Sequence, residues 1–135
     1  MPAYDKPLPP IDELSRPFWD AARAGELRLP GCKACQHLRS QFERWCPRCG
    51  SDQFDWVRLS GRGTVWSHAA FHRMYFKSFE DDLPYGVALV ELEEGPRLIS
   101  NIVGVPREAV DIGMPVEAVF DAVTSEVTLV KFRPR

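Results

Sequence analysis

All four cysteines of the chain fall into two pairs of identical spacing, Cys32-x-x-Cys35 and Cys46-x-x-Cys49, with ten residues between the pairs. Each pair can place two thiolates on one backbone turn, and the residues between the pairs can fold into a hairpin that brings both to one metal ion. The second pair encloses a proline, which stiffens the turn, and precedes a glycine, which lets backbone N–H groups point at sulfur. The spacing therefore predicts a four-thiolate metal site.

Zinc is the usual occupant of four-cysteine ribbons, so we expect Zn²⁺ here, with a rubredoxin-like iron site as the alternative. A redox dithiol or a set of disulfides is disfavoured, because two pairs occur together and a reducing compartment keeps thiols free. Four protein ligands leave no open position for water or a substrate. We therefore expect the metal to be structural and to take no part in hydrolysis.

The composition is that of an ordinary globular protein, with 44% apolar and 27% charged residues in a chain of 135. No apolar run approaches the roughly 18 residues of a membrane-spanning helix, and the N-terminus lacks the basic-then-apolar layout of a signal peptide. These features predict a soluble, cytoplasmic protein with no membrane contact. The net charge is -2, and residues 61–135 carry eight basic against eleven acidic side chains, which disfavours a nucleic-acid partner.

The elements that must position the cysteines divide into an N-terminal arm and helix (1–26), a zinc ribbon (27–60) and a barrel (61–135). The helix is expected to run from Ser15, as its N-cap, to Gly25, and short strand-like pieces at 26–29 and 54–57 flank the cysteines. Five runs rich in β-branched and aromatic residues predict strands over 64–76, 86–92, 97–103, 115–120 and 127–132, with room for one helical turn at 106–111. The chain is therefore expected to be mainly β and to end in a five-stranded OB-fold barrel, although the strand count alone also fits an SH3-like barrel.

Several motifs follow one another in a characteristic order: FW at 18–19, the cysteine ribbon, SGRGTV at 60–65, PYGVALVEL at 84–92, IGMPV at 112–116 and KFRP at 131–134. In this order they resemble the Zn-ribbon/OB-fold family of acyl-CoA-associated accessory proteins, long described as a domain of unknown function. The resemblance covers about residues 15–134. One departure lies before the second cysteine pair, where the family commonly carries a Pro-Pro-Arg-like run and this chain reads Gln41-Phe42-Glu43-Arg44.

The resemblance implies an N-terminal helix or helical hairpin, a rubredoxin-like zinc ribbon and an OB-fold barrel. It also implies a function, because members of the family are typically encoded and assembled with thiolase-like or hydratase-like enzymes that act on acyl-CoA thioesters. The chain would then be a non-catalytic accessory subunit of a hetero-oligomeric complex of thiolase, acyltransferase or aldolase type, and would help to form or stabilise its acyl-CoA site. The residues agree with this role, since every cysteine is assigned to the metal and none is left as a thiolase-type nucleophile.

A second hypothesis, from a different class, is binding of single-stranded nucleic acid, because OB barrels and zinc ribbons both occur in such proteins. The acidic barrel half argues against it. For a catalytic role, His68 and His72 are the only titratable pair of interest. Their even spacing places them on one strand face, and we expect them to be ordinary surface or packed residues.

Two further sets of residues are candidates for binding. Phe18 and Trp19, on the short helix, fit core packing and docking on a partner equally well. CoA requires cations for its phosphates, and Arg62 at the entry to the first barrel strand, Arg73 on it and Lys77 just past it are expected to form a cluster at one end of the barrel. For any one of these three cations, a neutralised surface charge is the simpler explanation.

Overall fold

The computed structural model describes residues 8–9, 11–39, 44–71 and 85–135, and every structural statement below concerns these residues. They form a mainly β structure with one short helix, as predicted. The elements are α1 (Arg16–Arg23), β1 (Leu27–Cys32), β2 (Phe54–Leu59), β3 (Arg62–Phe71), β4 (Tyr85–Leu92), β5 (Arg97–Ser100), the 3-10 turn η2 (Arg107–Ala109), β6 (Pro115–Ala122) and β7 (Thr128–Pro134). No helix among the described residues has the length and apolar character needed to cross a membrane.

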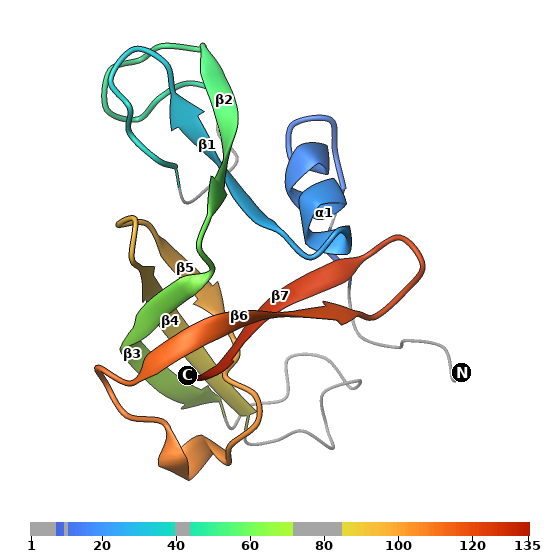
Figure 1. Cartoon of the computed structure of the whole chain (residues 1–135), viewed down its shortest axis with the longest axis vertical. Helices are drawn as coiled ribbons and strands as arrows, with labels where there is room; N and C mark the ends of the chain where they lie inside the picture. The colour runs from blue at the N-terminus through green and yellow to red at the C-terminus, as the bar shows by residue number, and fades with distance from the viewer. Residues whose placement is uncertain (1–7, 10, 40–43, 72–84) are drawn as a thin grey trace.

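The ribbon and the barrel occupy the two ends of the molecule. Figure 1 shows the β1–β2 pair at one end and β3 to β7 at the other, with α1 beside the place where they meet. The first ten residues, expected to form an extended arm, lie almost entirely outside the described part of the chain.

The helix α1 begins and ends through local hydrogen bonds. The N–H of Ser15 donates to Asp12 Oδ1 (2.7 Å) and the N–H of Asp12 donates to Ser15 Oγ (3.3 Å), and this reciprocal pair lowers the pKa of Asp12. Ser15 occupies the N-cap position, as expected, but its hydroxyl makes no capping hydrogen bond to the helix and instead accepts the N–H of Asp12. At the other end Gly25 has a φ of 80° and its N–H donates to Ala22 O (3.0 Å), which is the expected glycine stop.

The strands β1 and β2 form an antiparallel pair in which Leu27 lies opposite Leu59 and Cys32 lies opposite Phe54. Leu27 and Leu29 are both buried, because alternate residues of a strand share one face and this face lies against α1. The hairpin thus starts in the apolar core and ends at the first cysteine.

The remaining strands form one sheet in the order β5-β4-β3-β6-β7, with every neighbouring pair antiparallel. Its longest strand, β3, lies in the centre and carries a bulge, because the pairing with β4 shifts between Val65 and Ser67. The extra residue, Trp66, is half-exposed on the outer face, where the Arg97 guanidinium lies 3.9 Å from the centre of its ring. All five predicted barrel strands are therefore present, although residues 72–76 of the first lie outside the description.

The two edges of this sheet meet at one place. Ile102 forms a parallel bridge with Phe132, the N–H of Phe132 donates to Asn101 O (3.0 Å), and the N–H of Val103 donates to Phe132 O (2.7 Å). This strand order with a parallel closure is the arrangement of an OB barrel and resolves the choice against the SH3-like alternative. The strand predicted over 97–103 is shorter than expected, since the chain leaves β4 after Ser100 in order to reach β7.

One apolar core joins the helix, the hairpin and the barrel. Phe18 is buried in it, together with side chains from β1, β2 and the barrel strands, including Leu29, Val90 and Phe132. Trp19 is only half-buried, and its ring packs edge-on against Phe18 with the ring centres 4.9 Å apart. Of the two roles that the sequence left open for Phe18, the geometry supports core packing.

Replacing Phe18 by Ala should lower the free energy of unfolding by about 3–5 kcal/mol, because it leaves a cavity at the junction of the three parts. Ile112→Ala is the control, since Ile112 is 70% exposed and its loss should cost no more than about 0.5 kcal/mol. Urea denaturation of both variants measures the difference. Equal midpoints would mean that Phe18 does not belong to the core.

Candidate metal centre

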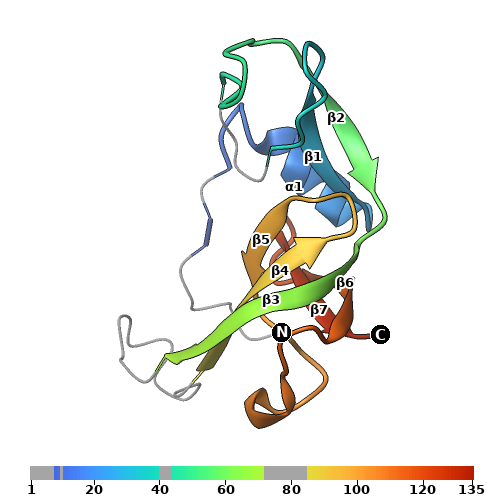
Figure 2. The same cartoon turned by 90° about the vertical axis from the view of Figure 1, so that its left-hand side faces the viewer.

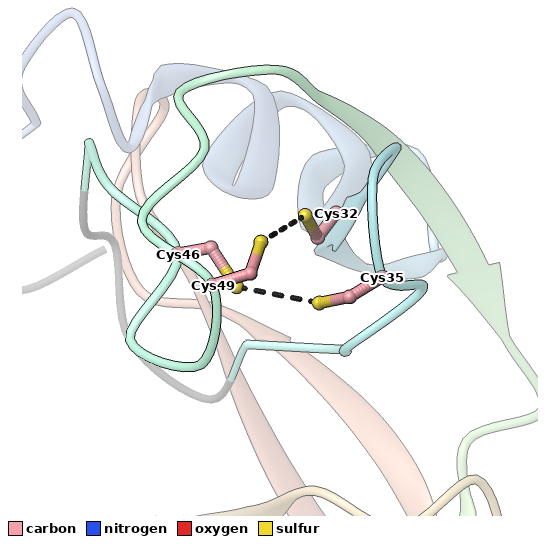
Figure 3. A group of neighbouring side chains, drawn as sticks. All are labelled: Cys32, Cys35, Cys46 and Cys49. Carbon is pink, nitrogen blue, oxygen red and sulfur yellow. Dashed lines mark hydrogen bonds between the residues drawn. The ribbon is translucent and has the colours of Figure 1, made fainter.

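The four cysteines converge at the tip of the ribbon, as Figure 3 shows. The Sγ atoms of Cys32 and Cys49 lie 3.6 Å apart, as do those of Cys35 and Cys46, and all four sulfurs lie within 4.8 Å of one another. Each close pair joins one cysteine of the first CxxC to one of the second. The two halves of the motif therefore interleave around a common centre, and no disulfide is formed.

This donor set fits a tetrahedral metal ion. A Zn–S bond of about 2.3 Å places the sulfurs of an ideal tetrahedron about 3.8 Å apart, close to the two 3.6 Å separations. Cys32 and Cys46 are buried, whereas Cys49 is exposed. The residues can thus hold a closed four-thiolate metal site without rearranging the backbone.

The two halves of the site have the same backbone design. The N–H of Gln36 donates to Cys32 O and the N–H of Gly50 donates to Cys46 O, both at 2.9 Å. Both donors have a positive φ, 62° for Gln36 and 79° for Gly50. The glycine after the second pair meets this requirement at no cost, whereas the first half places a glutamine in a conformation that side chains disfavour.

Hydrogen bonds to sulfur and the crowding of the thiols shift the pKa values of the cysteines. Burial raises the pKa of Cys46, but the backbone N–H groups of Cys49 and Arg48 lower it, and the resulting pKa is about 6. The backbone N–H of Ser51 lowers the pKa of Cys49, yet its hydrogen bond with Cys32 and its burial raise the pKa to about 12. Opposite shifts are expected when thiols crowd together, because one thiolate disfavours the next. A metal ion would remove this conflict.

Arg39 connects two segments of the ribbon through its guanidinium. It is buried, its guanidinium lies 4.7 Å from the centre of the Phe54 ring, and its Nη2 donates to Ser51 O (3.4 Å). Ser51 O also accepts the N–H of Cys46 (2.7 Å). The position of Arg39 suits a cation close to a thiolate cluster.

Of the three cations expected to bind CoA, the structure describes one. Arg62 begins β3, is half-exposed and pairs with Glu93 (Nε to Oε1, 3.1 Å). Arg73 and Lys77 lie outside the described residues, so their clustering with Arg62 stays a prediction.

Two hollows in the barrel wall were not foreseen from the sequence. One is a small pocket of about 70 Å³ lined by His68, Gly86 and Arg107, among others. The other, of about 590 Å³, lies between β5 and β7 and is bordered by Trp19. Neither has a local sequence signal, because each gathers residues from strands that are distant in the chain.

Comparison with known proteins connects this fold to a family. Residues 56–121 match the family described as ChsH2, C-terminal OB-fold domain. A probable enoyl-CoA hydratase alpha subunit of Thermomonospora curvata is 40% identical over 129 residues, which cover 96% of this chain and 40% of that protein. A DUF35 domain-containing scaffold protein of Pyrococcus furiosus is 37% identical over 109 residues, 79% of this chain and 77% of that protein. The chain thus spans about two fifths of the length of the first relative.

A solved structure has the same fold as this chain. A chain of the Ltp2-ChsH2(DUF35) aldolase has a TM-score of 0.83 and 39% identity to this protein, and the match covers 94% of this chain and 98% of that one. The family resemblance predicted from the ordered motifs is confirmed. Similarity of this extent over most of both chains, together with the OB barrel, means that the chain belongs to the DUF35 family.

Proposed function

We propose that this chain is a non-catalytic scaffold subunit of an acyl-CoA-processing complex of the thiolase, acyltransferase or aldolase type. The observation that carries the proposal is the match over nearly the whole chain to the DUF35 component named in an aldolase structure, at 39% identity. A relative named as a hydratase alpha subunit supports the link to acyl-CoA enzymes. The catalytic partner would be a thiolase-like or hydratase-like subunit, with which the chain forms a hetero-oligomer.

The chemistry of the chain itself supports a role without catalysis. All four cysteines lie in the sulfur cluster, and with a metal bound there none would be available as the nucleophile that a thiolase requires. A cluster of four thiolates also leaves a metal no position for a substrate. The chain would then act by holding the partner in an active form and by completing its acyl-CoA site.

The structural metal would be zinc, held by Cys32, Cys35, Cys46 and Cys49. The ribbon needs such a metal because, among the described residues 33–53, Cys46 and Arg39 alone are buried. Binding of zinc to thiolates then supplies folding free energy that an apolar core would supply elsewhere. The free thiols accord with a cytoplasmic location, where they stay reduced.

The test of the scaffold role is reconstitution. The chain should copurify with an acyl-CoA enzyme that mass spectrometry identifies. Once both are produced separately, that enzyme should lose most of its activity without this chain and regain it on mixing. The chain alone should show no turnover of any acyl-CoA. Turnover by the isolated chain, or full activity of the enzyme without it, would contradict the proposal.

For the metal, elemental analysis should find about one zinc per chain, and Cys46→Ser should lose it and unfold the ribbon. His37→Ala is the matched control, since His37 lies in the same ribbon but is not a member of the sulfur cluster, and it should keep its zinc. Iron in the purified protein would favour the rubredoxin-like alternative. A folded, metal-free chain with four titratable thiols would rule out a structural metal.

For the ligand, we propose that cations of the barrel contact the phosphates of CoA in the assembled complex. Replacing Arg62, Arg73 and Lys77 together by Ala should weaken CoA binding by about 1.5–3 kcal/mol per lost contact. Arg62→Ala alone shows how much of the loss belongs to the cation that pairs with Glu93. Calorimetry with CoA measures both. Unaltered affinity in both variants would place the whole cofactor site on the partner.

A further inference from the structure

The barrel wall is open between β5 and β7. The closure through Ile102 and Phe132 lies at one end of this seam, and further along it the strands are joined by a single side-chain bond, from Ser100 Oγ to Val130 O (2.8 Å). The groove of about 590 Å³ lies here, with β5 on one side, β7 on the other and Phe18 and Trp19 of α1 beneath. Figure 2 shows β5 as the last strand of its side of the sheet.

The free edge of β5 offers backbone groups to the groove. In an antiparallel pair, residues alternate between bonding the neighbour and facing away from it. The N–H of Leu92 donates to Pro96 O (2.8 Å), and in the β4–β5 register this makes Leu98 and Ser100 the residues that bond β4. Arg97 and Ile99 therefore direct their N–H and C=O groups away from β4. The described part of the chain provides no backbone partner for them there.

Two side chains along the groove also lack a partner. The indole Nε1 of Trp19 is buried and has no hydrogen-bond acceptor among the described residues. Ile99 is 78% exposed, the most exposed of the large apolar side chains that the structure describes. A buried donor without an acceptor costs about 1–3 kcal/mol, and natural proteins usually protect an apolar strand edge. Both features disappear if another group fills the groove.

The chemistry of the groove selects an extended peptide. An acyl chain could cover Ile99, but it could not satisfy the N–H and C=O groups of β5. The β5 strand of a second copy does not fit either, because β4 already occupies one of its edges and the groove has strands on both sides. The occupant must be a single extended segment with both backbone edges free.

We infer that the groove between β5 and β7 receives an extended apolar segment of the catalytic partner, which adds to the free edge of β5. This inference rests on the proposed function for the existence of that partner. Main-chain bonds to Arg97 and Ile99 supply binding energy. Side chains of the segment pack on Ile99 and Trp19, and a backbone C=O accepts the indole N–H.

The decisive substitution is Ile99→Pro. It removes one outward N–H while leaving the β4 ladder intact, and proline is tolerated on a strand edge at such a position. The dissociation constant of the complex with the separately produced catalytic subunit should rise at least fivefold, as expected for one net hydrogen bond. Ile99→Val, which keeps the N–H and the branched side chain, is the matched control and should bind within twofold of the original protein. Zinc content and circular dichroism check the fold of each variant.

Hydrogen exchange on the unaltered chain gives an independent reading. The amides of Arg97 and Ile99, which face away from β4, should exchange fast in the free chain and at least tenfold more slowly in the complex. Trp19→Phe, which keeps a ring but loses the N–H, should weaken binding about fivefold. If the wild-type chain binds no acyl-CoA enzyme, the proposed function fails. If it binds but Ile99→Pro binds equally well and the Arg97 and Ile99 amides stay unprotected, only this inference fails.

Other occupants give other results, each of which would overturn the inference. Protection of the Arg97 and Ile99 amides by an acyl-CoA alone would assign the groove to an acyl chain. Protection that depends on the concentration of the chain would assign it to a second copy. Protection already present in the dilute free chain would mean that a segment of the chain itself lies there.

Discussion

A two-stranded antiparallel hairpin is at best marginally stable in water, and the hairpin of β1 and β2 is what connects the ribbon to the rest of this protein. Its two ends lie in different surroundings, one in the apolar core and the other at the sulfur cluster. At one end Leu27 and Leu29 are buried against α1 in the core that also contains Phe132. At the other end the strand runs directly into Cys32, the first residue of the sulfur cluster. The six residues of β1 therefore connect the apolar core to the sulfur cluster.

The same helix stabilises the barrel. Phe18 and Trp19 lie beneath the seam between β5 and β7, where the strands are not joined by a ladder of backbone bonds. An OB barrel closed at one end and separated at the other exposes a strand edge that most proteins cover. Phe18 and Trp19 of α1 line the seam, and the described residues leave the outer edge of β5 there without a backbone partner. The proposed scaffold role would use this combination, since such a subunit must be stable and must also bind.

The features that could be predicted from the sequence are those that depend on residues close together in the chain. The CxxC spacing is enough to predict the sulfur cluster, because two residues per turn can meet a metal wherever the ribbon lies. The helix end at Gly25 was likewise readable from residue type. Ser15 is the N-cap as predicted, but the pairing of its hydroxyl with the N–H of Asp12, in place of a capping bond, was not readable. The length of β5 was overestimated because β propensity continues through Val103 although the chain changes neighbour after Ser100.

The sequence by itself determined the class of the protein: a four-cysteine ribbon, a short helix, five barrel strands and a family. These follow from residue type and spacing along the chain, which report local conformation and metal chemistry directly. The tertiary structure alone decided that Phe18 belongs to the core, that Arg62 pairs with Glu93, and that the described residues leave one edge of β5 beside Trp19 without a backbone partner. Those facts depend on which distant segments become neighbours, and that is set by packing and strand closure over the whole chain.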